Sequence, residues 1–141
     1  MRDNERVPIV LVAAKADIFN NIKDALSDTD IALLYAETKH EAIALLERLK
    51  NEIDLAIIEL ELPDFGAWEI IRQFRRRRLQ KPLKILATTS LYHSLELDDV
   101  LGRGIDAVVP KGLPPEDWRR TVEAALGKGE TDLFREAASG V

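Results

Sequence analysis

The sequence predicts an α/β fold in which one doubly wound parallel sheet of five strands is covered by five helices. Two observations predict it: five short, nearly continuous apolar runs occur along the chain, and segments of helical period separate them. An alternation of strand and helix gives a parallel sheet with helices on both faces, and right-handed crossovers limit the arrangement to a doubly wound domain. The length of 141 residues and the apolar fraction of 46% fit a single domain with one real core.

The five apolar runs are the expected strands. Each is short and nearly unbroken, as is typical of strands that are buried on both faces of a sheet. In chain order they are Val7–Ala13, Ile31–Ala36, Leu55–Ile58, Leu83–Ala87 and Ala107–Val109. Because consecutive parallel strands need a crossover connection, we expect helices between them.

Apolar residues at helical spacing mark these helices. A helix that packs one face against a sheet repeats its apolar positions every three or four residues. Four segments follow this spacing, marked by Ile18, Ile22 and Leu26; by Ala42, Leu45, Leu46 and Leu49; by Ala67, Ile70, Ile71 and Phe74; and by Trp118, Val122 and Leu126. The segment Leu91–Arg103 is the remaining expected helix, although its apolar residues are less regular.

Two helix starts carry local signals. Thr38 followed by Glu41 has the spacing of a capping box, in which each side chain accepts a hydrogen bond from the other residue's backbone amide. Pro114 and Pro115, followed by two acidic residues, are typical of a first helical turn, because proline fits there and acids favour the positive end of the helix dipole. We therefore expect helices to begin at these two places.

Composition excludes several classes of function. Cysteine is absent, so disulfides, zinc–thiolate sites and a thiol nucleophile are excluded. The formal net charge of −5 argues against nucleic acid as a partner of this domain. No apolar run reaches the roughly 18 residues of a membrane span, and the first residues, MRDNERVP, lack the apolar stretch of a signal peptide. We expect a cytoplasmic protein that does not contact a membrane.

A candidate site lies at the carboxyl ends of the expected strands, where open α/β sheets bind their ligands. Glu59 ends the third strand, Thr89 follows the fourth and Lys111 follows the fifth, so these side chains converge on one edge of the sheet. No glycine-rich phosphate-binding pattern follows the first strand, where Ala13 and Ala14 stand. Taken alone, the three convergent residues favour a structural ion pair beside a hydroxyl over a binding site, because ion pairs at sheet edges are common.

The segments IDLAIIELELPDFGAWEII and GRGIDAVVPKG resemble the receiver domains of response regulators in two-component signalling. Glu59 stands where that family carries its phospho-accepting aspartate, with Pro63 four residues later. Thr89 lies 30 residues after Glu59 and Lys111 a further 22, which matches the family's switch hydroxyl and lysine. The resemblance covers residues 7–127 and implies the flavodoxin-like receiver fold with strand order 2-1-3-4-5. Residues 1–6 are then an N-terminal extension and residues 128–141 a C-terminal tail or linker.

The chain departs from the family at the residues that carry its chemistry. The acidic pair that would hold Mg²⁺ is replaced by Ala13 and Ala14, whose methyl groups offer no oxygen ligand. The extra methylene of Glu59 displaces the acceptor carboxylate, and in-line transfer is sensitive to such a shift. Val108 replaces the aromatic residue whose rotamer follows phosphorylation. The resemblance therefore implies a degenerate receiver that uses no metal or other cofactor.

We expect a non-enzymatic pseudo-receiver that binds a protein partner in signal transduction without phosphorylation. One alternative is a divergent phosphorelay receiver that a histidine kinase still phosphorylates, although Asp54 and Asp64 are poorly placed as acceptors. Another is a flavodoxin-like module that binds a small anionic ligand through Thr89 and Lys111. A further hypothesis is that the Glu59 carboxylate, close to Lys111, imitates part of the charge of a phosphoaspartate.

The resemblance implies an interface on the face formed by the fourth helix, the fifth strand and the fifth helix. The residues that carry this candidate interface are Tyr92, Leu95, Asp98, Asp99, Arg103, Arg119 and Arg120. Their mixture suits a protein interface, including that of a symmetric homodimer, and equally a plain solvated surface. The run Arg75–Arg78 either complements the dipole at a helix end or contacts an acidic protein, nucleic acid or anionic lipid.

Overall fold

The computed structural model describes residues 6–77, 83–92, 100 and 102–127. Five strands form one sheet in which every pair of neighbours is parallel. Their order is β2-β1-β3-β4-β5, and they span Ile9–Ala13 (β1), Ala32–Ala36 (β2), Leu55–Glu59 (β3), Lys84–Thr89 (β4) and Ala107–Pro110 (β5). The predicted sheet and its strand order are confirmed.

The last three strands extend further toward their carboxyl ends than the apolar pattern predicts. Glu59 belongs to β3 and pairs with Thr88 of β4, and Thr89 pairs with Pro110 of β5. The side chains of Glu59, Thr88 and Thr89 are buried. Because an apolar run ends where polar residues begin, the sequence pattern stops short of strand ends that carry buried polar groups.

Four α-helices lie in the described part of the chain. They are α1 (Ala16–Ala25), α2 (Lys39–Leu49), α3 (Gly66–Arg76) and α5 (Pro115–Ala125), and a short 3₁₀ helix, η2 (Pro63–Phe65), leads into α3. The sequence predicts five helices. The remaining one, expected over Leu91–Arg103, falls mainly on residues 93–99 and 101, which lie outside the described residues. None of the described helices is long and apolar enough to cross a membrane.

Both predicted helix starts are confirmed. At the start of α2, Thr38 Oγ1 accepts a hydrogen bond from the Glu41 amide at 3.2 Å, and the Glu41 carboxylate accepts one from the Thr38 amide at 3.3 Å. This reciprocal capping box satisfies amides that a helix N-terminus otherwise leaves without partners. Helix α5 begins with Pro115 after an extended Pro114, at a position where no intrahelical acceptor is available to an amide.

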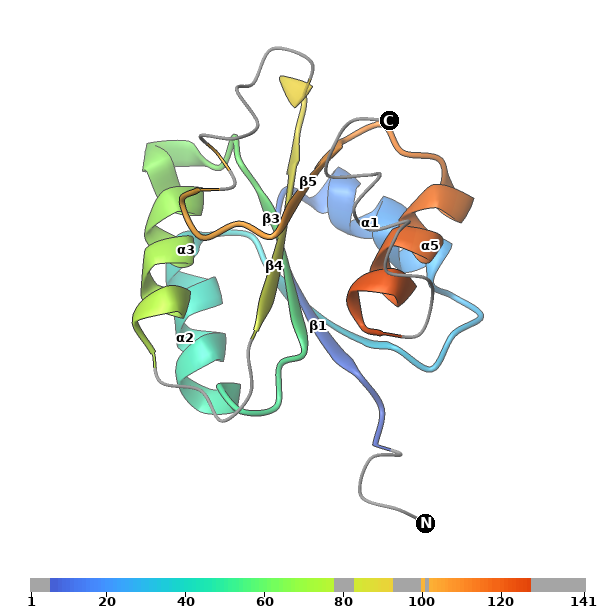
Figure 1. Cartoon of the computed structure of the whole chain (residues 1–141), viewed down its shortest axis with the longest axis horizontal. Helices are drawn as coiled ribbons and strands as arrows, with labels where there is room; N and C mark the ends of the chain where they lie inside the picture. The colour runs from blue at the N-terminus through green and yellow to red at the C-terminus, as the bar shows by residue number, and fades with distance from the viewer. Residues whose placement is uncertain (1–5, 78–82, 93–99, 101, 128–141) are drawn as a thin grey trace.

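The sheet is covered on both faces, with α1 and α5 on one side and α2 and α3 on the other (Figure 1). Alternate strand residues therefore face different cores. In β3, Leu55 and Ile57 join the cluster that contains residues of α1 and α5, whereas Ala56 and Ile58 join the cluster of α2 and α3. All four are fully buried, which explains why the sequence shows an unbroken apolar run here.

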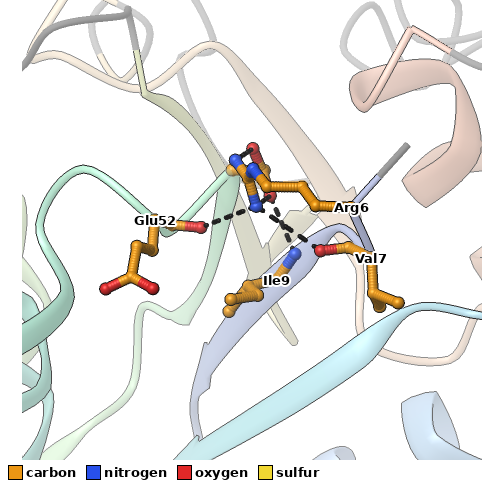
Figure 2. Close-up of polar contacts among 5 residues, drawn as sticks. Arg6, Val7, Ile9 and Glu52 are labelled. Atoms are coloured by element: carbon orange, nitrogen blue, oxygen red, sulfur yellow. Dashed lines mark hydrogen bonds and ion pairs between the residues drawn. The ribbon is translucent and has the colours of Figure 1, made fainter. Parts of the chain in front are cut away.

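Arg6 joins the amino-terminal ends of β1 and β3, at the opposite end of the sheet from the candidate site. Its Nη2 donates to Asp54 Oδ1 at 2.7 Å, and Asp54 Oδ2 accepts from the Ile9 amide at 2.8 Å. Figure 2 shows the Arg6 side chain directed toward the backbone carbonyl of Glu52, to which it donates at 3.4 Å. Because Asp54 is engaged at the other end of β3 from Glu59, it is poorly placed to replace that residue.

Arg75, at the end of α3, ties together three backbone segments. Its Nε donates to the Gly104 carbonyl at 2.8 Å, its Nη1 to the Leu83 carbonyl at 2.6 Å and its Nη2 to Asp106 Oδ2 at 2.8 Å. Gly104 has a φ of 96°, which favours glycine, and a Cβ there would lie 3.1 Å from Arg75 Cγ, so a larger residue would have to displace the Arg75 side chain. Arg75 therefore has a structural role. That role comes from hydrogen bonds to residues distant in the sequence.

The other described arginines of the run Arg75–Arg78 differ in their surroundings. Arg77 forms an ion pair with Glu47 of α2, whereas Arg76 is exposed to solvent. Arg78 lies outside the described residues. The alternative that this run contacts an acidic protein, nucleic acid or anionic lipid stays a prediction.

Candidate functional site

Glu59, the last residue of β3, is the centre of the candidate site. Its side chain has no exposed surface. The Lys15 amide, just after β1, donates to Oε1 at 2.9 Å, and the Lys111 ammonium, just after β5, lies 2.6 Å from Oε2. Burying a carboxylate is costly unless the group is both paired and hydrogen-bonded. The Lys111 ion pair and the hydrogen bond from the Lys15 amide meet both conditions.

Lys111 is shared between two carboxylates. Besides Glu59, its Nζ contacts Oε1 of Glu61 at 2.9 Å. Burial lowers the pKa of Lys111, but the hydrogen bonds and charges of the two glutamates outweigh burial and hold this pKa above 10.5. The side chain is therefore a cation at neutral pH. The Lys111 amide donates to the Thr89 carbonyl at 3.2 Å, which fixes the turn beside the end of β4.

Glu61, in the turn after β3, completes the site. The Thr89 hydroxyl donates to Oε2, and the Ser90 amide donates to Oε1 at 3.3 Å. Burial raises the pKa of the Glu61 carboxyl, but the hydrogen bonds from Thr89, Lys111 and Ser90 outweigh that effect and hold this pKa below 4.5. Glu61 is therefore ionised at neutral pH, and 26% of its side chain is exposed.

The structure brings together the three residues that the sequence predicts for this site, with Glu61 as an unpredicted fourth. Glu59 contacts Lys111 directly, whereas the Thr89 hydroxyl bonds to Glu61. The sequence pattern gives Glu61 no role, since hydrophobic periodicity ends with the strand. Glu61 lies in the turn after β3, where the alternation of a strand no longer applies, so no sequence pattern points to it.

Apolar residues fill the positions of the expected acidic pair. Ala13 and Ala14 have no exposed surface, and the Ala14 amide donates to the Ala36 carbonyl at 3.1 Å. Val108 is likewise fully buried, within β5. Across the described ranges, no group of three or more histidine, cysteine, aspartate or glutamate side chains is placed to hold a metal ion. The side chains at these three positions offer only methyl groups.

One residue of the candidate interface lies in the core. Tyr92 is 6% exposed and belongs to the same core cluster as Val108, which corrects the expectation that it lies on an exposed face. Burial raises the pKa of its hydroxyl. The reason is the ring itself, since a large aromatic side chain gains more from packing against apolar neighbours than from solvent. Leu95, Asp98 and Asp99 lie outside the described residues.

The three arginines of the candidate interface are exposed and make contacts within the chain. The guanidinium of Arg103 lies 5.4 Å from the ring centroid of Trp68. Arg119 Nη1 lies 3.1 Å from Asp28 Oδ2, and Arg120 forms a longer ion pair within α5 at 3.9 Å. Exposed pairs of this kind contribute little to stability, so these cations remain available to a partner.

A pocket of about 270 Å³ opens beside the site, between α1 and the start of α5. Its lining includes Asn21, Asp24, Lys111 and Trp118. The indole Nε1 of Trp118 is buried and has no hydrogen-bond partner in the described part of the molecule. Asp24 brings negative charge to the pocket, and the Lys111 ammonium is already paired with two glutamates. The pocket is therefore poorly suited to a small anion.

Comparisons with known proteins bear on the fold. No family model matches the sequence, and no curated protein matches it. Among solved structures, a response regulator from Thermotoga maritima is 20% identical, with a TM-score of 0.71, over 86% of this chain and 99% of its own. A CheY-like receiver domain protein from Methanospirillum hungatei JF-1 is 25% identical, with a TM-score of 0.67, over 89% of this chain and 98% of its own.

A third similar structure contains a protein partner. The receiver domain of the Saccharomyces cerevisiae response regulator Ssk1, solved together with the histidine phosphotransfer protein Ypd1, is 17% identical to this chain. The likeness covers 84% of this chain and 87% of that one, with a TM-score of 0.69. The sheet order, the helices on both faces and these similarities agree, and the chain has the receiver fold of response regulators.

Proposed function

We propose that the protein is a cytoplasmic, non-enzymatic pseudo-receiver of two-component signalling, which binds a protein partner without phosphorylation or Mg²⁺. The observation that carries this proposal is the environment of Glu59. Its carboxylate has no exposed surface, and it is held by the Lys15 amide at 2.9 Å and the Lys111 ammonium at 2.6 Å. The receiver fold supplies the signalling context.

The contacts of Glu59 argue against phosphoryl transfer. An in-line attack needs a carboxylate oxygen that faces the donor with a free lone pair and in the correct position. Oε1 of Glu59 accepts from the Lys15 amide, Oε2 is ion-paired with Lys111, and the side chain has no exposed surface, so a donor reaches neither oxygen without a rearrangement. Two carboxylate side chains, Glu59 and Glu61, also share the Lys111 ammonium, which leaves this cation less available to an anionic donor.

Among the described residues, no group of three acidic or histidine side chains near Glu59 is placed to hold the metal of a magnesium-dependent transfer. Mg²⁺ requires near-octahedral oxygen ligands, including one or two carboxylates. Ala13 and Ala14 occupy the positions where the resemblance to receivers implies such acids, and both are fully buried. Without the metal, the charge of an arriving phosphoryl group has no adequate neutraliser, which favours a function that does not depend on phosphorylation.

A protein is the partner that the surface fits best. Arg103, Arg119 and Arg120 are exposed cations, and Leu91, one residue beyond Ser90, is an apolar side chain that is 54% exposed. Mixed charged and apolar surfaces of this kind are typical of protein interfaces. The receiver domain of Ssk1, which shares this fold, was solved with a protein partner. A homodimer through some of these residues is the second form that we propose for such an interface.

The two alternatives receive less support. Binding of a small anion through Thr89 and Lys111 is opposed by Glu61, which already occupies both groups. A divergent phosphorelay receiver requires Glu59 to leave its contacts with Lys15 and Lys111 before it can react. Within the described part of the chain, no contact favours that rearrangement.

Phosphoryl uptake tests the proposal. The full chain is incubated with acetyl phosphate and Mg²⁺, and its intact mass is measured; a receiver with an aspartate acceptor and an acidic pair is the positive control. We expect no phosphoryl adduct on this chain under conditions that modify the control. An adduct that forms on the wild type and is lost in Glu59→Gln establishes the phosphorelay alternative and overturns the proposal.

A further inference from the structure

Three hydrogen-bond donors from two parts of the chain converge on the carboxylate of Glu61. The Thr89 hydroxyl comes from the end of β4, the Ser90 amide from the next residue, and the Lys111 ammonium from the turn after β5. The hydroxyl binds Oε2, while the amide and the ammonium bind Oε1 at 3.3 Å and 2.9 Å. Both carboxylate oxygens are thus occupied.

This set of donors is chemically matched to an oxyanion. A cation, a backbone amide and a hydroxyl form charge-assisted hydrogen bonds of the kind that bind carboxylates and phosphates in proteins. The Leu91 amide donates to Thr89 Oγ1 at 3.0 Å, so the hydroxyl oxygen serves as an acceptor there and its proton is left for Glu61. The pairing of β4 with β5 fixes Thr89 relative to Lys111. The donors are therefore oriented by the fold.

We propose that Thr89, Ser90 and Lys111 form a carboxylate-binding site whose resident ligand is the chain's own Glu61. Glu59 cannot take this role, because its side chain is fully buried and bound to the Lys15 amide. Glu61 is 26% exposed, so its removal opens the site to solvent. The proposal goes beyond the function proposed above, since it assigns a ligand site and its occupant whichever partner the domain binds.

The covalent link explains why the site is filled. A ligand attached through a short segment of chain has an effective concentration in the millimolar range or above, so free carboxylates at lower concentration do not displace it. With Glu61 bound, the site joins the carboxyl ends of β3, β4 and β5 through side chains. The Thr89 side chain is consequently held in one position, as a fixed element rather than a switch.

Removal of Glu61 tests the proposal directly. Sodium acetate is titrated into full-length Glu61→Ala while two-dimensional amide NMR spectra are recorded, with sodium chloride at equal ionic strength as the salt reference. We expect saturable shifts of the Ser90 and Lys111 amides with a Kd in the millimolar range, and no such shifts in the wild type. Glu52→Ala is the matched control, because Glu52 is an exposed glutamate at the other end of the sheet, and it is expected to behave like the wild type.

Two results overturn the proposal. One is a folded Glu61→Ala protein whose Ser90 and Lys111 amides do not respond to acetate; the other is a wild type that binds acetate as tightly as the variant. If Glu61→Ala does not fold, an acid titration of the wild type takes its place. The NMR resonances of the Glu61 carboxyl carbon and the Ser90 amide are then expected to shift with one common midpoint. A Ser90 amide resonance that does not shift in this titration contradicts the proposed site. These readouts report occupancy and not phosphorylation, so their failure is distinguishable from failure of the proposed function.

Discussion

The ammonium of Lys111 lies 2.6 Å from Oε2 of Glu59, a carboxylate that has no exposed surface. This contact joins the carboxyl ends of β3 and β5 across β4, which lies between them in the sheet. Glu61 adds a second carboxylate to the same cation and connects it to Thr89 of β4. These side-chain contacts therefore connect the carboxyl ends of β3, β4 and β5.

Loss of Lys111 is expected to destabilise the fold strongly. Lys111→Met leaves Glu59 buried without its cation, and breaking a buried ion pair in this way costs about 3–5 kcal/mol. The double variant Glu59→Met/Lys111→Met is expected to recover most of this loss, because an apolar pair in place of a buried ion pair is often neutral. Urea unfolding of the two variants and the wild type measures both effects. A cost below about 1 kcal/mol for Lys111→Met, as for an exposed pair, contradicts the burial argument.

Glu61 is expected to make stability depend on acid pH. Its pKa in the folded protein lies below 4.5, so its stabilising contribution is complete above pH 4.5 and is lost as the pH falls through the lowered pKa. Glu61→Gln removes this contribution. The difference in unfolding free energy between wild type and variant is therefore expected to shrink from neutral pH to about pH 3. Urea unfolding across that range measures it, with Glu52→Gln as the control; a difference that stays constant contradicts the assignment.

Substitution of Gly104 is expected to lower the stability of the fold. Gly104→Ala places a Cβ at a φ of 96° and 3.1 Å from Arg75 Cγ, and a non-glycine residue in such a conformation costs about 1–3 kcal/mol. Gly112→Ala is the matched control, because a Cβ there meets nothing within 4 Å. Thermal unfolding is expected to show a lower midpoint for the first variant and little change for the second. Equal midpoints for the two variants are the outcome that this account excludes.

Substitutions of two neighbouring arginines, Arg75 and Arg76, are expected to have different effects on the free energy of unfolding. Arg75 donates three hydrogen bonds to Gly104, Leu83 and Asp106, and hydrogen bonds made by a charged group contribute about 1.5–3 kcal/mol each. Arg75→Gln therefore costs at least about 2 kcal/mol in urea unfolding, whereas Arg76→Gln, at an exposed position, stays within about 0.5 kcal/mol of the wild type. Similar stabilities for both variants would show that the contacts of Arg75 are dispensable.

Much of the fold follows from the sequence because its causes are local or periodic. Unbroken apolar runs mark strands with both faces covered, and the Thr38–Glu41 pair marks the start of α2 by capping chemistry alone. The convergence of Glu59 and Lys111 is also predictable. Parallel strands end at one edge of a sheet, so residues that terminate different strands meet there.

The rest depends on tertiary geometry that no local pattern encodes. Glu61 lies in a turn, where its direction depends on donors 28 or more residues away. The role of Arg75 depends on the path of the chain at Gly104, not on the end of its own helix. Tyr92 follows the fourth strand like a surface residue but packs into the core with Val108. In each case the deciding contact is distant in sequence.

An amide NMR titration with Mg²⁺, followed by beryllofluoride as a phosphoryl mimic, tests the central claim most directly. If the site is closed by its own ion pairs and has no metal ligands, the amides of Glu59, Thr89 and Lys111 do not shift at millimolar Mg²⁺, and beryllofluoride adds no further change. Shifts at these three residues that spread along β4 and β5 contradict the account. They would mean that a phosphorylation switch operates without the acidic pair.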